Sequence, residues 1–287
     1  MDWLLIPFEV SFVQRALVAG VLVSVACALV GTWVVVRGMA FIGDAMSHGM
    51  LPGVALASLA GVNLVLGAAV SAGVMALGVT VLSRSRRLSQ DTTIGLLFVG
   101  MLATGVIIVS HSRSFAVDLT GFLFGDVLAV GHGDLVVLAL ALAVVAAVSV
   151  LGYRSFVALS FDTRKAHSLG LRPGLANALL LTLVTLTIVA SFRVVGTLLV
   201  FGLLIAPAAA ALFWAKRIRT IMLVAALLGI LATVAGLLVS WHWGTAAGAS
   251  IAAGAVLLFF LSALLSFAQR RLSRRHPHPT TEVERSR

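Results

Sequence analysis

Asp44 and His48 are the two residues of this sequence best suited to hold a metal ion. Asp44 is the one carboxylate between Glu9 and Asp91, and the first histidine follows it four positions later, in the segment GDAMSHG at 43–49. A spacing of four places both side chains on one face of a helix. There, a carboxylate oxygen and an imidazole nitrogen can bind one divalent cation together. The pair therefore predicts a metal-binding position.

The composition of the chain is that of a polytopic helical membrane protein. Hydrophobic residues make up 61% of its 287 residues and charged residues only 10%, and its mean hydropathy is +1.14. Soluble globular domains do not have this composition. A charged Asp at the bilayer centre costs about 2.5–3.5 kcal/mol on insertion scales, so Asp44 is expected to face a cavity or a partner. The single cysteine, Cys27, excludes an intrachain disulfide and a cysteine-based zinc site.

Apolar stretches of the length that a bilayer demands predict an all-α fold with about nine transmembrane helices. The predicted spans are 14–36, 40–60, 63–82, 92–110, 134–153, 174–192, 196–214, 221–240 and 245–267. The second span contains Asp44, His48 and Pro52, and a proline there should kink or loosen the helix. The segment 115–130 is short and polar and suits a re-entrant or interfacial helix, which leaves eight or ten spans open.

Basic residues predict the orientation of these spans. Arginines and lysines follow the third, fifth, seventh and ninth spans, and all four groups fall on one side if the count is nine. The positive-inside rule makes that side the cytoplasm, with the N-terminus outside. We expect a membrane domain over 1–268 and a basic, disordered cytoplasmic tail over 269–287. The net charge of +10 thus reflects topology, and basic residues scattered over short loops do not favour a nucleic-acid partner.

One cytoplasmic loop differs from the others. The segment 159–173, LSFDTRKAHSLGLRP, begins with capping residues, is long enough for about two helical turns and stops at a glycine and a proline. It predicts a short amphipathic helix parallel to the membrane. Such a helix can be a connector that lies on lipid headgroups, or a docking helix that accepts force from a soluble partner.

Four segments of the chain resemble a known family of transport proteins. They are VGTWVVVRGMAFIGDAMSH at 30–48, FLFGD at 122–126, the stretch from Asp162 to Gly170, and SFRVVGTLLV at 191–200 with LLIAPA at 203–208. Together they are similar, in order and spacing, to the ABC-3 permeases, which are the membrane subunits of zinc, manganese and iron importers. The resemblance runs from about residue 12 to residue 267.

The resemblance implies a permease of the type II ABC importer class and a set of partners. Two permease copies would form a homodimeric pathway, and an extracytoplasmic binding protein would deliver the metal. A separate cytoplasmic ATPase would dock through 160–172, on the residues that match the coupling helix of the family: Asp162, Thr163, Arg164, Lys165, Ala166, His167 and Gly170. The sequence agrees, because it contains no G-x-x-x-x-G-K-[ST] phosphate-binding loop. We therefore expect a transport subunit rather than an enzyme.

The same resemblance implies that Asp44 and His48 line the translocation path and coordinate the ion. One hard oxygen and one borderline nitrogen suffice for transient binding, whereas a complete tetrahedral cage would trap zinc. We expect Zn²⁺ first and Mn²⁺ second as the transported substrate, with no permanently bound cofactor. The alternative is structural: Asp44 would cap the second helix and His48 would fill a polar packing niche.

Several polar residues are weaker candidates on the outer side. They are His111, Asp118, Asp126, His132 and Asp134. Such residues could form an acidic mouth that attracts metal or a docking surface for the binding protein. Ordinary solvated loop polarity explains them about as well.

Three other classes of function compete with a metal permease. A proton-coupled secondary carrier should show an internal repeat, and it would leave 162–170 unexplained. An intramembrane metalloenzyme would need more ligands near His48, and the chain has no HExxH motif. A permease for iron chelates or vitamin B12 shares the architecture and differs only in its cargo.

Overall fold

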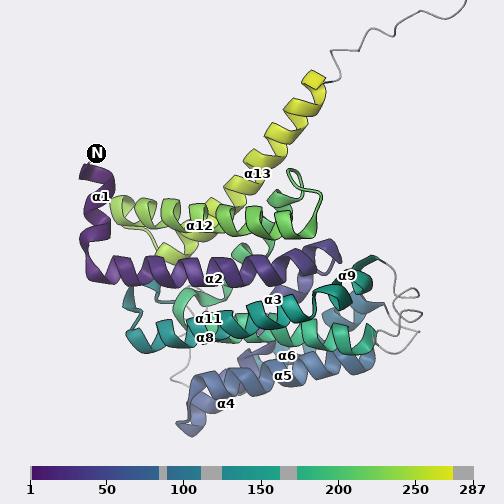
Figure 1. Ribbon diagram of the computed structural model, residues 1–287. Coiled ribbons are helices and arrows are strands. Elements are labelled where there is room, and N and C mark those ends of the chain that lie inside the picture. The colour runs from purple at the N-terminus through teal and green to yellow at the C-terminus, as the bar shows by residue number, and fades with distance from the viewer. Residues whose placement is uncertain (1, 84–88, 111–124, 162–172, 274–287) are drawn as a thin grey trace, which may run out of the picture.

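The computed structural model describes residues 2–83, 89–110, 125–161 and 173–273, and these ranges confirm the predicted all-α class. The elements are α1 (Asp2–Glu9), α2 (Ser11–Val36), α3 (Phe41–Gly49), α4 (Leu51–Ala60), α5 (Leu64–Leu82), α6 (Gln90–Ser110), the 3₁₀ turn η2 (Val127–Ala129), α8 (His132–Leu151), α9 (Tyr153–Phe161), α11 (Pro173–Ala211), α12 (Ile218–Trp243) and α13 (Ala247–Ser273). Figure 1 shows their arrangement.

The helices follow the predicted spans with two differences. Among the described residues, seven helices are long and apolar enough to cross a membrane, so the chain is a multi-pass membrane protein and the predicted count of nine is approximate. The second predicted span, 40–60, is divided into α3 and α4. The sixth and seventh form one 39-residue element, α11, with a non-helical residue at Gly196. That break lies next to the boundary that the sequence predicts between 192 and 196.

Helix α2 lies at the centre of the bundle. It packs against α11, α12 and α8, and Figure 1 shows it between α12 and the layer formed by α8 and α11. Two-thirds of its apolar window is buried, against 17% for α6 at the edge. Its buried Ser24 hydroxyl hydrogen-bonds the Thr233 hydroxyl of α12 at 3.0 Å. Hydrogen bonds between helices help to hold them together in lipid. The hydrophobic effect does not, because the lipid tails are as apolar as the side chains.

Helix α11 folds back on itself at Gly196. Gly43 of α3 faces Leu204, because a methyl group added there would lie 2.9 Å from the Leu204 Cδ2. One turn later, the Met46 sulfur lies 3.8 Å from the Thr185 hydroxyl. In a straight helix, Thr185 and Leu204 would be about 28 Å apart at a rise of about 1.5 Å per residue. The two halves of α11 must therefore run side by side, as two spans joined at Gly196.

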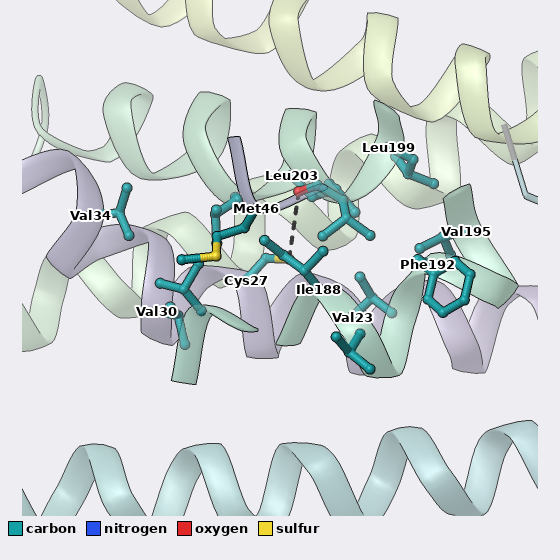
Figure 2. Close-up of a cluster of buried hydrophobic side chains, with 14 of the residues drawn as sticks. Val23, Cys27, Val30, Val34, Met46, Ile188, Phe192, Val195, Leu199 and Leu203 are labelled. Atoms are coloured by element: carbon teal, nitrogen blue, oxygen red, sulfur yellow. Dashed lines mark hydrogen bonds between the residues drawn. The ribbon is translucent and has the colours of Figure 1, made fainter. Parts of the chain in front are cut away.

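Figure 2 shows the same reversal of α11 among the buried hydrophobic side chains. Ile188, Phe192 and Val195 lead towards the turn, and Leu199 and Leu203 lie back along the first half. The Cys27 thiol of α2 points to the Val200 carbonyl, with 3.9 Å between sulfur and oxygen. All of these apolar side chains are buried. The α11 hairpin thus forms the surface on which both α2 and α3 rest.

Replacing Gly196 with Ala should destabilise the bundle by about 2 kcal/mol. Its φ of 73° and ψ of 163° belong to a region of backbone space that only glycine adopts without strain of about 1–3 kcal/mol. Thermal unfolding of the purified protein in detergent, followed by size-exclusion chromatography, would measure the loss. Gly202→Ala is the control, since a methyl group there meets Ala252 at an ordinary 3.4 Å. Equal melting temperatures for both variants would contradict the hairpin geometry.

Several sequence predictions fall on segments outside the described residues. They include all but the end of 115–130, the loop 162–172 and the tail from 274. Helix α13 runs to Ser273, so the chain is helical for five residues beyond the predicted domain boundary at 268. The side of the membrane on which each terminus lies stays a prediction.

Candidate functional site

The short helix α3 exists because the second apolar stretch is interrupted by Pro52. Proline has no N–H, so it cannot donate to the carbonyl oxygen four residues earlier, which belongs to His48. The Met50 N–H bonds that oxygen instead, and Met50 separates α3 from α4. The Ser71 hydroxyl of α5 then donates to the Gly49 carbonyl at 2.7 Å. The predicted kink is confirmed, and it ends α3 directly after His48.

The start of α3 is fixed through Arg37, the residue that follows α2. Its guanidinium donates a hydrogen bond of 2.8 Å to the Asn177 side chain of α11. Burial lowers the pKa of Arg37, but an arginine side chain remains charged in proteins. The bond ties the turn between α2 and α3 to the first half of the α11 hairpin. Both ends of α3 are therefore held by neighbouring helices.

Helix α3 has a packed side and a partly open side. Ile42, Ala45 and Met46 are fully buried, and α3 contacts α11, α6 and α5. Asp44 and His48 lie together on the other side, with 32% and 26% of their side chains exposed. A carboxylate in the first turn of a helix is also favoured by the helix dipole. The arrangement leaves the two metal-binding groups accessible while the rest of the helix is anchored.

The two side chains are separated by the distance that two ligands of one ion require. The His48 Nε2 lies 3.5 Å from the Asp44 Oδ1, longer than a typical hydrogen bond. Two ligands at about 2.0–2.1 Å from a tetrahedral zinc ion lie about 3.3 Å apart, and the somewhat longer bonds of a larger ion widen this separation. The Asp44 Oδ1 and the His48 Nε2 can therefore both bind one ion with almost no rearrangement.

The second ring nitrogen of His48 is unusual. Its Nδ1 is buried and has no hydrogen-bond partner among the described residues. The His48 ring contacts Phe98 of α6 edge to face, with 5.4 Å between ring centroids. Histidines that hold a metal permanently almost always bond a carboxylate, carbonyl or water through the other nitrogen. The apolar Phe98 ring beside His48 therefore suits a histidine that binds a metal ion weakly and releases it.

Phe98 is a site residue that the sequence did not identify. It also packs edge to face on Phe41, with centroids 5.4 Å apart, so its ring bridges the start and the end of α3. Nothing in the residue pattern of α6 distinguishes it from the apolar residues around it. Only the packing of α6 against α3 brings it to the histidine.

A single chain supplies two metal ligands here. In the part of the chain that the structure describes, no group of three or more His, Cys, Asp or Glu side chains could hold a metal ion. The cap role proposed as an alternative for Asp44 is not seen, because the N-cap of α3 is Ala40 and has no side-chain cap bond. Within the described residues, Asp44 and His48 thus have no third protein ligand beside them.

The remaining predicted residues are not gathered at this site. Asp126 accepts a bond of 3.2 Å from the Ala129 N–H, and Asp134 accepts one of 3.0 Å from the Gly131 N–H, so both cap local turns. His132 is exposed at the start of α8. His111 and Asp118 lie outside the described residues, as do the predicted docking residues Asp162, Thr163, Arg164, Lys165, Ala166, His167 and Gly170. A role for them in metal attraction or docking stays a prediction.

Comparison with known proteins identifies the family. The model of the ABC 3 transport family matches residues 9–266, a range that includes α3 and the α11 hairpin. The chain belongs to the ABC 3 transport family. Among curated members, it is 38% identical to a probable iron transport system membrane protein of Haemophilus influenzae, over 87% of this chain and 92% of that one. It is 36% identical to the manganese transport system membrane protein MntC of Halalkalibacterium halodurans, over 92% and 90%.

Solved structures agree with the family assignment. PsaBC from Streptococcus pneumoniae, solved in complex with Fab, superposes with a TM-score of 0.82 at 30% identity, over 96% of this chain and 99% of that one. An inward-facing putative metal-chelate type ABC transporter gives a TM-score of 0.66 at 15% identity, which shows a shared fold alone. This member of the ABC 3 family is thus a membrane subunit of a transport system.

Proposed function

We propose that this chain is the permease of an ATP-driven importer of divalent transition-metal ions. The observation that carries the proposal is the Asp44–His48 pair, with 3.5 Å between oxygen and nitrogen on one partly exposed helix face. An ionisable pair inside a membrane domain is costly and is retained for function. The relatives in the ABC 3 family that are named for manganese or iron transport support the same class.

The cargo we propose is Mn²⁺ first, with Fe²⁺ next and Zn²⁺ after them. The sequence alone placed zinc first because a histidine suits it. The relatives described above are instead named for iron or manganese transport, and a carboxylate oxygen with one imidazole accommodates manganese and ferrous iron as well. Intrinsic affinity is lowest for manganese among the divalent first-row metals and peaks at copper, so selectivity must come from geometry and delivery.

Asp44 and His48 form half of a transient binding site for the ion. Two ligands from one chain hold an ion weakly, and the apolar contact of the His48 ring with Phe98 gives the imidazole no supporting acceptor. A second copy of the chain, related by two-fold symmetry, would contribute a second pair. Water would complete the coordination shell while the ion passes.

The energy for transport comes from a separate ATPase. The sequence has only two lysines, Lys165 and Lys216, and no phosphate-binding loop. We propose that residues 160–172 dock this ATPase on the cytoplasmic side, that the N-terminus lies outside, and that an extracytoplasmic protein delivers the metal. The residues that would contact the ATPase are the seven that match the coupling helix of the family, from Asp162 to Gly170.

Uptake into proteoliposomes tests the proposed function. Vesicles with this chain and its ATPase should accumulate radioactive Mn²⁺ only when ATP is present on the ATPase side and the binding protein on the other. Competition with unlabelled Fe²⁺ and Zn²⁺ gives the order of preference. Accumulation driven by a proton gradient without ATP would instead identify a secondary carrier. Uptake of an iron chelate but of no free ion would identify a chelate permease.

A further inference from the structure

A cavity of about 660 Å³ opens between α2, α8, α9 and α12, away from the Asp44–His48 pair. It is lined by Val25, Ala28, Leu29, Ser149, Val150, Tyr153, Arg154, Arg219, Met222, Leu223 and Ala226. The volume is in the range of sites that hold a small molecule. Metal transport, as proposed above, makes no use of it.

Most of the cavity wall is apolar and faces outward. Apart from Arg219, its residues on α2 and α12 are apolar, and Val150 and Leu223 on its rim are 75% and 63% exposed. In a membrane domain such exposed aliphatic side chains face lipid. The wall therefore suits a hydrocarbon chain that enters from the bilayer.

The other part of the cavity carries positive charge and hydrogen-bond donors. Arg154 and Arg219 are both exposed at its edge. The Arg219 guanidinium lies over the Tyr153 ring, with Cζ 5.1 Å from the ring centroid. Among the described residues neither arginine forms an ion pair, since the one pair found there joins Asp44 and His48. Two guanidinium groups thus border one cavity, and no described carboxylate pairs with either of them.

Ser149 provides a second, independent indication of a ligand. The residue is 4% exposed and lines the cavity. Its hydroxyl is buried and has no hydrogen-bond partner in the part of the chain that the structure describes. A buried hydroxyl without a partner is costly, and a bound acceptor would satisfy it.

We propose that this cavity binds one anionic phospholipid. The acyl chains would lie along α2 and α12, and the phosphate would bind Arg154 and Arg219, because a guanidinium matches phosphate oxygens with paired donors. The ester and phosphate oxygens offer acceptors to Ser149. Arg219 follows the basic residues Lys216 and Arg217, which the positive-inside rule assigns to the leaflet where anionic lipids concentrate.

Charge favours a lipid over a second copy of this protein in the cavity. The chain has a net charge of +10, so another copy would bring mostly positive charge towards Arg154 and Arg219. An anionic headgroup neutralises both arginines, and its hydrocarbon part needs no protein partner. The lipid would also contact both α9 and α12. Helix α9 directly precedes the segment 162–172, which we propose to dock the ATPase.

Native mass spectrometry of the purified full-length protein tests this assignment. The protein would be released from vesicles containing equal amounts of phosphatidylglycerol and phosphatidylcholine, and the retained lipid identified. We expect phosphatidylglycerol to be retained preferentially, and the double variant Arg154→Gln, Arg219→Gln to lose that preference by about tenfold. The double variant Arg270→Gln, Arg271→Gln removes an equal charge at the exposed end of α13 and should retain the lipid as the native protein does.

Two further variants separate the possible occupants. Ala226→Phe fills part of the apolar end of the cavity and should reduce lipid retention without changing either arginine. Leu223→Cys places a reactive thiol on the rim, and the native Cys27 is buried and will not compete. Equal retention of both lipids, full retention by the double arginine variant, or efficient crosslinking of Leu223→Cys to a second copy would each overturn the proposal.

Discussion

Asp44→Asn and His48→Ala should each reduce ATP-dependent manganese uptake by about 10- to 100-fold. The first change weakens one of the two ligands and the second removes the other, and perturbing even an indirect metal contact typically costs this factor. Asn keeps the size of Asp44 but loses the charge that offsets a divalent cation. Because both side chains are partly exposed on α3, neither change should unfold the bundle. Initial rates of uptake into proteoliposomes at several metal concentrations would measure the loss.

Matched controls separate a lost ligand from a general loss of charge. Asp91→Asn removes an exposed carboxylate in the first turn of α6, and His242→Gln removes a histidine at the end of α12. Both should transport at the native rate. A double variant at Asp44 and His48 should be little worse than either single variant, because the residues act as one unit. Native rates for both site variants would remove Asp44 and His48 from the pathway.

Gly31→Ala should destabilise the protein by about 3 kcal/mol or prevent its assembly. A methyl group at Gly31 of α2 would overlap the Leu204 carbonyl oxygen and would lie 2.9 Å from its carbonyl carbon. These are backbone atoms of α11, so no side chain can rotate away and the two helices must separate. Overpacking of this kind costs about 1–3 kcal/mol or more. Because Leu204 also contacts α3, the separation would disturb the metal site too.

Gly73→Ala is the control for this change. Gly73 lies inside α5, and a methyl group there meets nothing within 4 Å. Alanine is a better helix former than glycine by about 0.5–1 kcal/mol, so this variant should be as stable as the native protein or slightly more stable. Thermal unfolding in detergent should show Gly31→Ala melting about 5 °C or more below the native protein. A melting temperature at or above the native value would refute the close contact of α2 and α11.

The sequence by itself determined the class of the protein and the pair that could bind metal. Long apolar stretches require membrane helices wherever they occur, and Pro52 must interrupt a helix because it lacks an N–H. The spacing of Asp44 and His48 is equally local, since four residues along any helix bring two side chains together. The division of α11 also follows the sequence, since the predicted spans end at 192 and begin again at 196, beside the break at Gly196.

The tertiary structure decided everything that joins residues far apart in the chain. The contact of His48 with Phe98, the bond of Arg37 to Asn177 and the cavity with its two arginines each combine helices from different parts of the sequence. In a chain where almost every helix is apolar on all sides, hydrophobic periodicity does not say which faces meet. Close backbone approaches at small residues such as Gly31 select those faces, and they exist only once the helices have packed.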